Sequence, residues 1–225
     1  MSSTAPDARA AWPVIAAAIA VVAFPLFGGR FAIDLATSII VSAIFALSLA
    51  LLVGETGLVS FGHAAFLGIG AYATALLAPK VGAPSLLWLA PAVVAVTAAC
   101  ALAIGALSIR TRGVYFIMVT LAFSQMAYYV FHDTGIGGGS DGIYITARPT
   151  LPFVASLGDG RTFYYVAVAC LFATFLLLTA IKRARFGHAL AGIRVNEARM
   201  RAAGFPTYAY KLAAFTLAGA LAGVA

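Results

Sequence analysis

Long apolar stretches, separated by short polar or glycine-containing segments, dominate this chain. A helix needs about 20 apolar residues to cross roughly 30 Å of hydrocarbon, and six stretches have about that length. They cover residues 11–27, 35–53, 58–78, 85–109, 114–131 and 163–181. A seventh stretch, 212–225, has 14 residues when the sequence ends. The pattern predicts an all-α fold, a polytopic transmembrane helix bundle.

The composition agrees with lipid as the main solvent. Of the 225 residues, 63% are hydrophobic and 9% are charged, whereas a soluble domain carries about 25% charged residues. The two cysteines, Cys100 and Cys170, lie inside apolar stretches, which favours small core residues over a disulfide or a metal site.

The ends of the sequence carry two further expectations. A helix that stops within a bilayer leaves its last carbonyl groups unpaired. We therefore expect residues 1–225 to be a single transmembrane domain that is truncated at its C-terminus. The first stretch has an alternative interpretation as a cleaved signal peptide, although no clear small-residue cleavage site follows it.

The distribution of Lys and Arg predicts the orientation. With the N-terminus in the cytoplasm, the inside segments carry ten basic residues and the outside segments carry four, as the positive-inside rule requires. Residues 182–211 are then cytoplasmic and residues 132–162 are extracytoplasmic. The net charge of +7 comes largely from one block between apolar stretches, which argues against binding to nucleic acid.

Segment 54–72 is unusual for a membrane span because it holds five glycines together with Glu55 and His63. Non-helical backbone at membrane depth occurs only where protein or a water-filled cavity covers it. A helix-packing face and an element that lines a transport route both remain open. The candidate route residues are Ser60, His63, Gly68 and Gly70, with Thr120 and Gln125 from the fifth stretch. Thr120 and Gln125 fit a role in hydrogen bonds between helices as well as they fit the route.

Small residues recur at helical spacing in the last stretch. Gly219 and Gly223 form a GxxxG pattern, and Ala214, Ala218 and Ala222 form a parallel stripe. Small side chains let helix backbones approach closely in a membrane. The pattern predicts faces on which helices of the bundle pack.

The basic segment predicts a short amphipathic helix over residues 189–203. Apolar residues recur on one face, an acidic and a basic residue stand four positions apart, and a glycine and a proline follow as a stop signal. These positions are Leu190, Ile193 and Met200, then Glu197 and Arg201, then Gly204 and Pro206. Docking on anionic lipid and docking on a protein both fit such a helix.

Several chemistries are disfavoured by the sequence. Segment 135–142 is rich in glycine but lacks the Lys-Ser/Thr pair of a P-loop, so it fits an extracytoplasmic turn or gate. No Ser/His/Asp, His/Glu/His or paired intramembrane carboxylate arrangement indicates an enzyme. His63 alone does not provide the relay that a proton-coupled carrier needs.

Four motifs occur in an order that resembles a known family. They are residues 54–72 (GETGLVSFGHAAFLGIGAY), 112–123 (RGVYFIMVTLAF), 138–143 (GGSDGI) and 185–204, which contains RFGHAL, NEA and AG. The chain resembles the permease subunits of branched-chain amino-acid ABC importers, the LivM type. Members of that family are longer and continue beyond this last stretch, in line with the expected truncation.

The resemblance implies a multi-pass permease of the inner membrane, with no catalytic residue, metal or cofactor of its own. It implies four partner proteins: a second, similar permease, two cytoplasmic ATP-binding subunits that hold ATP and Mg²⁺, and an extracytoplasmic substrate-binding protein. Membrane lipid would surround the spans. Branched-chain amino acids are the implied substrate, with urea, short amides or aromatic acids as alternatives. A stand-alone secondary carrier is the alternative from another class.

The resemblance also implies that residues 182–211 form the cytoplasmic coupling loop. Glu197 and Gly204 resemble the acidic and glycine positions of the loop that docks on the ATPase, and Arg194 and Arg201 accompany them. The spacing from Glu197 to Gly204 is seven residues, one more than the common pattern of that loop, and the trailing Ile-x-Leu-Pro is absent. Docking of the whole loop is therefore a firmer expectation than the role of any one residue.

Overall fold

The computed structural model describes residues 21–25, 28–78, 85–139, 142–143, 150 and 160–225. Within these residues the regular structure is helical, apart from one isolated parallel bridge between Ser85 and Thr150. Four helices are long and apolar enough to cross a membrane: Arg30–Thr56, Leu86–Ser108, Val114–Asp133 and Gly160–Arg183. The all-α polytopic fold is confirmed. Most of the first predicted stretch lies outside the described residues, and with it the signal-peptide alternative.

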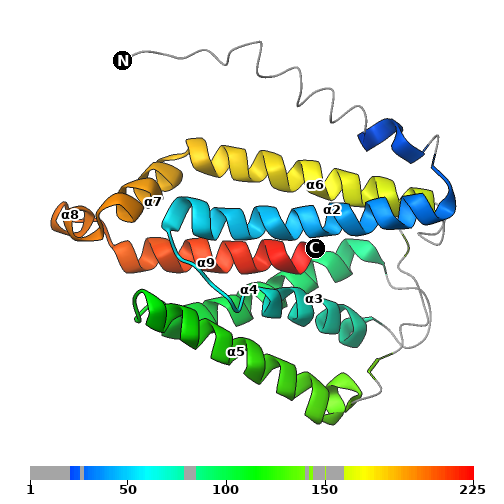
Figure 1. Cartoon of the computed structure of the whole chain (residues 1–225), viewed down its shortest axis with the longest axis horizontal. Coiled ribbons are helices and arrows are strands. Elements are labelled where there is room, and N and C mark those ends of the chain that lie inside the picture. Colours follow the sequence, from blue (N-terminus) through cyan, green and yellow to red (C-terminus); the bar gives the residue numbers. More distant parts are fainter. Residues whose placement is uncertain (1–20, 26–27, 79–84, 140–141, 144–149, 151–159) are drawn as a thin grey trace.

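The helices follow one another along the chain, and the longest connection, between α5 and α6, is described only in part (Figure 1). The α2 helix runs directly into a π-helical turn, η1, and the α7 and α8 helices are short. The bounds are α2 (Arg30–Ala50), η1 (Leu51–Thr56), α3 (Ala64–Leu77), α4 (Leu86–Ser108), α5 (Val114–Asp133), η2 (Gly135–Gly137), α6 (Gly160–Arg183), α7 (Arg185–Val195), α8 (Glu197–Ala202) and α9 (Thr207–Val224).

The α9 helix lies at the centre of the bundle, where it packs against α2, α3 and α4 (Figure 1). Phe215 of α9 is buried and makes edge-to-face contacts with Phe66 of α3 and Phe116 of α5, at ring-centroid distances of 5.6 and 6.2 Å. Such aromatic pairs add to the stabilisation that burial provides. The three rings join the two sides of the bundle around α9.

Close backbone approach explains the small residues of α9. A Cβ atom at Gly219 would lie 2.4 Å from the Cβ of Ala101, and one at Gly223 would lie 2.3 Å from the Oγ1 of Thr97. Both contacts are with α4. Ala214, Ala218 and Ala222 are fully buried. The predicted packing faces are confirmed.

Three helix starts differ from the apolar pattern by at least five residues. The α2 helix begins at Arg30 rather than at residue 35. The α3 helix begins at Ala64 rather than near residue 58, because the chain turns before it. The α9 helix begins at Thr207, five residues before the apolar stretch at 212, and so includes Lys211. Glu197 of α8 pairs with Lys211 and stabilises it in a buried position. The segment 182–211 contains the end of α6 and the start of α9.

A single methyl group tests the contact between α9 and α4. Gly219→Ala should lower the free energy of unfolding by about 1–3 kcal/mol, the usual effect of overpacking. Gly68 of α3 has open space around its Cβ position, so Gly68→Ala should leave that free energy unchanged or raise it by up to about 1 kcal/mol. Thermal unfolding in detergent measures both, and equal effects would contradict close packing at Gly219.

Candidate coupling site and substrate route

The helix that starts as α2 ends in η1, and the chain then turns without regular structure over residues 57–63. Gly57 has φ +72°, a left-handed conformation that glycine adopts without the penalty of a Cβ atom. The α3 helix starts only at Ala64. The glycine-rich segment therefore contains an interruption of helical backbone, whereas the apolar pattern predicted a span from residue 58.

Ser60 and His63 lie inside the protein. The exposed fraction of their residue surfaces is 6% and 2%. The Nε2 of His63 is 2.8 Å from the Oγ of Ser48 on α2, and its ring lies against Phe45 and Phe66. The histidine is thus held by α2 and α3 in the interior of the bundle.

The middle of α5 lies against the interruption. A Cβ atom at Gly62 would be 2.0 Å from the carbonyl oxygen of Thr120, so the two backbones touch. Thr120 is buried, and its hydroxyl donates to the carbonyl oxygen of Ile117 in its own helix. Thr120 therefore marks where α5 covers the segment 57–63.

A cavity of about 230 Å³ lies between α3 and α5. Small residues and aromatic rings form most of its wall, with Ser124 and His132 as polar members. The lining residues are Ala64, Ala65, Gly68, Ile69, Tyr72, Ser124, Ala127, Tyr128, Phe131 and His132. Gly68 is the predicted route residue that lines it, whereas Gly70 faces Gly223, with its Cβ position 3.1 Å from that backbone.

Gln125 lies on the exposed side of α5. This side also carries Tyr115, Met118 and Tyr129, with exposed fractions of 73%, 62% and 57%. The residues recur at spacings of three, seven and four, so they follow one face of the helix. We call Tyr115, Met118, Gln125 and Tyr129 the α5 face.

The predicted cytoplasmic helix over 189–203 is two helices. The chain is extended at Asn196, with φ −155° and ψ 95°, and α8 begins at the next residue. The Oδ1 of Asn196 accepts a hydrogen bond of 2.9 Å from the backbone N–H of Arg199. Asparagine is among the best N-cap residues, and this cap explains why one helix ends and another starts.

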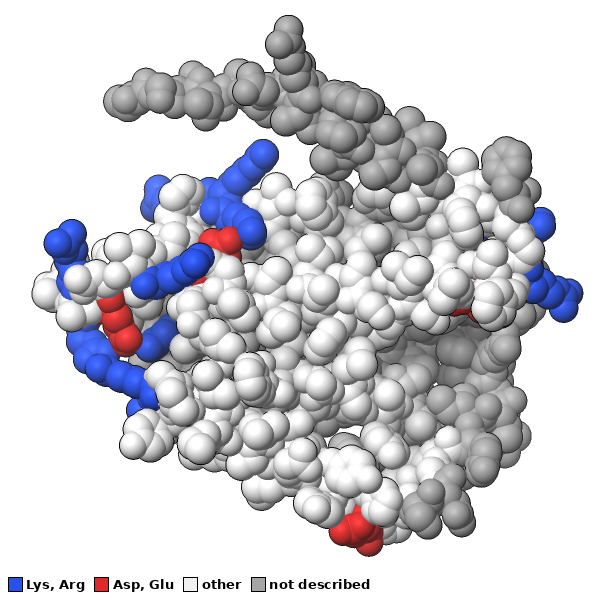
Figure 2. Space-filling model, in the orientation of Figure 1, with Lys and Arg blue, Asp and Glu red and all other residues white. Residues whose placement is uncertain are grey.

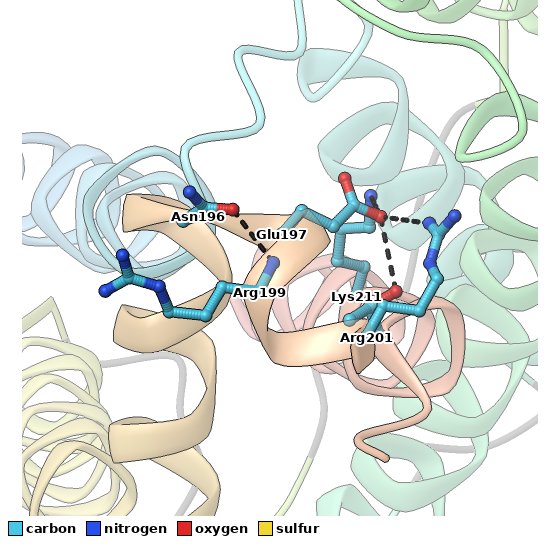
Figure 3. A network of polar contacts seen from close by, with 6 residues as sticks. Asn196, Glu197, Arg199, Arg201 and Lys211 are labelled. Atoms are coloured by element: carbon cyan, nitrogen blue, oxygen red, sulfur yellow. Dashed lines mark hydrogen bonds and ion pairs between the residues drawn. The ribbon is translucent and has the colours of Figure 1, made fainter. Parts of the chain in front are cut away.

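Glu197 is the centre of a polar network that ties α8 to α9 (Figure 3). Its Oε1 is 3.0 Å from the Nζ of Lys211 and 2.9 Å from the Nη2 of Arg201. The hydroxyl of Thr207 donates to the same oxygen at 3.2 Å. The carboxylate that was predicted to contact an ATPase therefore has partners within its own chain.

The surroundings of Glu197 lower its pKa. Burial alone would raise this pKa, but the hydrogen bond and the charge of Lys211, the hydrogen bond from Thr207 and the charge of Arg112 outweigh it. A lowered pKa means that folding favours the carboxylate form. The ionised Glu197 thus stabilises the junction of α8 and α9.

Gly204 ends α8 in the way that the sequence indicates. Its φ is +87°. The backbone N–H of Phe205 donates to the carbonyl oxygen of Met200, and the backbone N–H of Gly204 donates to the carbonyl oxygen of Arg201. This is the hydrogen-bond pattern of a Schellman motif, in which a left-handed glycine follows the helix. Its backbone fixes the direction in which the chain leaves α8 towards α9.

Arg194 points to the interruption and not to α8. Its Nη1 donates to the carbonyl oxygen of Gly54 in η1. Beside it, the Nζ of Lys182 at the end of α6 is 2.9 Å from the Oε1 of Glu55. The sequence analysis missed the contacts of Arg194 and Lys182, because partners more than 100 residues apart leave no local spacing to detect. It also missed the pair of Lys211 and Glu197, which are 14 residues apart and belong to different helices.

The junction of α7 and α8 presents an exposed surface with apolar and basic members. Val195 is 86% exposed and Phe205 is 39% exposed, and Ala198, Arg199 and Ala202 are exposed between them. We call these five residues the tip surface. Val195 and Phe205 are the large apolar members of this surface, and Arg199 is its basic member.

Basic side chains gather at the end of the molecule that holds α7 and α8 (Figure 2). Nine of the eleven described Lys and Arg residues belong to this end, including Arg110 and Arg112 of the turn between α4 and α5. Arg30 and Arg161 lie at the starts of α2 and α6, at the opposite end. The fold thus collects the charges that the sequence assigns to one side.

Comparison with known proteins identifies the family. Residues 31–225 match the family described as "Branched-chain amino acid transport system / permease component". The chain belongs to this permease family. Family membership together with four membrane-capable helices makes it a membrane protein and a component of a transport system.

Two curated relatives of this permease carry the same description. The "High-affinity branched-chain amino acid transport system permease protein LivM" of Salmonella typhimurium is 31% identical over 235 residues, and that of Escherichia coli is 30% identical over 236 residues. In both cases the match covers 94% of this chain and 55% of the relative. The permease therefore spans about half the length of these relatives. No solved structure matches significantly.

Removal of the Glu197 carboxylate should destabilise the permease. Glu197→Gln leaves the buried ammonium of Lys211 without its counter-charge, which should lower the free energy of unfolding by about 1–3 kcal/mol. In the double variant with Lys211→Met, most of this loss should be recovered, as a double-mutant cycle of unfolding measurements would show. If the losses in unfolding free energy of the two single variants simply add in the double variant, Glu197 and Lys211 do not interact directly.

The pH dependence of that stabilisation has a definite sign. The pKa of Glu197 is lower in the folded protein than its ordinary 4.5. The contribution of its carboxylate to the free energy of unfolding is therefore complete at pH values above 4.5. It is lost as the pH falls through the lower, folded pKa. Glu197→Gln should therefore flatten the fall in unfolding temperature below about pH 4.5, relative to the parent.

Proposed function

We propose that this chain is the membrane-spanning permease subunit of an ATP-driven importer that carries branched-chain amino acids across the inner membrane. ATP and Mg²⁺ bind to two cytoplasmic ATPase subunits, and a second, similar permease and an extracytoplasmic binding protein complete the importer. The observation that carries this proposal is the tip surface, which a polar network holds on α7 and α8 at the basic end of a permease-family bundle.

The same distribution of charge supports a cytoplasmic location for α7 and α8. Membrane proteins retain Lys and Arg in their cytoplasmic segments, and the basic end of the described bundle includes both short helices. In this orientation the N-terminus is cytoplasmic and the end of α5 at Asp133 is extracytoplasmic. The tip surface then faces the compartment that contains ATP.

The tip surface fits docking on a protein better than docking on lipid. Its apolar members, Val195 and Phe205, flank exposed alanines and a single arginine, Arg199. Arg194 and Arg201, which a lipid-bound helix would direct to phosphate groups, instead bind groups of this chain. We assign the direct ATPase contact to Val195, Arg199 and Phe205, and we assign Glu197, Arg201 and Gly204 to holding that surface in place.

A substitution at the tip surface tests the ATPase contact. Val195→Asp should reduce co-purification of the ATPase at least about tenfold, because burying an unpaired carboxylate costs several kcal/mol. ATP-dependent leucine uptake into proteoliposomes should fall with it. His188→Asp, an exposed site on α7 outside the tip surface, is the control and should retain both. Normal uptake by Val195→Asp would refute docking at this surface.

The α5 face and the cavity between α3 and α5, which lie on different sides of α5, are our candidates for the substrate route. The amide of Gln125, in the middle of α5, is costly against lipid alone, so we assign the α5 face to the second permease. The cavity between α3 and α5 has small and aromatic walls that suit an aliphatic side chain. Gly68 and Gln125 belong to these surfaces, whereas Ser60, His63 and Thr120 support them from the interior.

Filling the cavity tests this route. Gly68→Leu should reduce leucine uptake at least about tenfold while the four partner subunits still assemble, because the added side chain occupies space that the substrate needs. Ala71→Leu adds similar bulk at an exposed position of α3 outside the cavity lining and should preserve uptake. Competition by urea, a short amide or an aromatic acid in the parent would identify the alternative substrates.

A further inference from the structure

Two cations from the corner between α6 and α7 hold the end of η1. Lys182, near the end of α6, pairs with Glu55 at 2.9 Å between Nζ and Oε1. Arg194, on α7, donates from Nη1 to the carbonyl oxygen of Gly54. The side chain of Glu55 is only 19% exposed, so protein shields this ion pair in part from solvent. We call these two contacts the η1 clamp.

The clamp acts on the last turn before the interruption. The final carbonyl groups of a helix have no partner within it, and the helix dipole places partial negative charge there. Two cations therefore stabilise the end of η1. The stem of Arg194 also covers the next turn, since a Cβ atom at Gly57 would lie 3.2 Å from the Cγ of Arg194.

We propose that the η1 clamp, with Arg194 as its positioning residue, transmits movement of α7 to the segment 57–63. Arg194 precedes Val195 of the tip surface on the same helix, so a partner that displaces the tip also displaces the guanidinium group. The inference rests on the proposed function, because it assumes that an ATPase moves the tip.

The far end of the segment carries this displacement to α5. Gly62 touches the backbone of Thr120, and His63 is bound to Ser48 of α2. A shift at Gly54 and Gly57 must therefore move the backbone against α5, on the side where α5 and α3 enclose the cavity. The network of Glu197 and Lys211 offers a second path, into α9, and an experiment must separate the two.

The test uses the complete importer in proteoliposomes, with Cys100 and Cys170 replaced and Phe61→Cys as reporter. Phe61 is 63% exposed and lies within the segment. Its labelling rate by a thiol reagent is measured without nucleotide and with ATP plus vanadate. We expect the two rates to differ in the parent. In Arg194→Gln the difference should disappear, and leucine taken up per ATP hydrolysed should fall about tenfold, the scale of one charged hydrogen bond.

Matched variants separate the clamp from general loss of charge. Arg183→Gln removes a neighbouring exposed charge and should retain the nucleotide-dependent difference in labelling. Lys182→Gln should reduce that difference in labelling, whereas Lys182→Arg keeps the positive charge and should retain it. Lys211→Met interrupts the path through α9 and should lower stability. Retention of the labelling difference in this variant supports the clamp, whereas its loss would assign the transmission to α9 and overturn the inference. If Arg194→Gln does not fold, Lys182→Gln and Arg194→Lys provide the same readout.

The outcomes distinguish the clamp from the function on which it rests. If the parent takes up leucine with ATP, and Arg194→Gln retains both the labelling difference and the uptake per ATP, the clamp does not transmit movement. Loss of ATPase co-purification in Arg194→Gln would make Arg194 a docking residue and would also overturn the inference. If the parent itself shows no ATP-dependent uptake, the proposed function fails, and the inference fails with it.

Discussion

The interruption of helical backbone at residues 57–63 constrains the rest of this bundle. Unpaired peptide groups at membrane depth are costly, so such a segment needs protein or a water-filled cavity around it. Here α5 covers Gly62, α2 binds His63, and α6 and α7 hold the turn before Gly57. The three long helices and the corner between α6 and α7 therefore fix the two ends of the segment, whereas Phe61 between them stays exposed.

The sequence predicted the features that depend on local pattern. Apolar length was sufficient for four of the predicted spans, and small-residue spacing was sufficient for the face of α9 that contains Gly219, because both reflect repeating geometry. Gly204 ended α8 as expected, since a left-handed turn strongly selects glycine. The break at Asn196 was visible as an N-cap residue before Glu197, but helical periodicity on either side of it suggested one continuous helix.

The candidate site was harder to predict because its contacts join distant parts of the chain. Arg194 and Gly54 are 140 positions apart, and Lys211 and Glu197 belong to different helices. A charged residue in a loop looks the same in sequence whether its partner is a protein, a lipid or its own backbone. The structure separates these cases at Glu197 and Arg194, and it assigns both side chains to contacts within the chain.

The sparse burial of α5 has a consequence for the biogenesis of the protein. Only 11% of its most apolar window is buried within the described bundle, so packing within this chain stabilises α5 weakly. The rest of the free energy that fixes its position must come from lipid or from protein outside the described residues, and any protein that binds α5 stabilises it by mass action. A copy synthesised without its neighbours would keep α5 loosely attached, and membrane proteases would preferentially remove such unassembled copies.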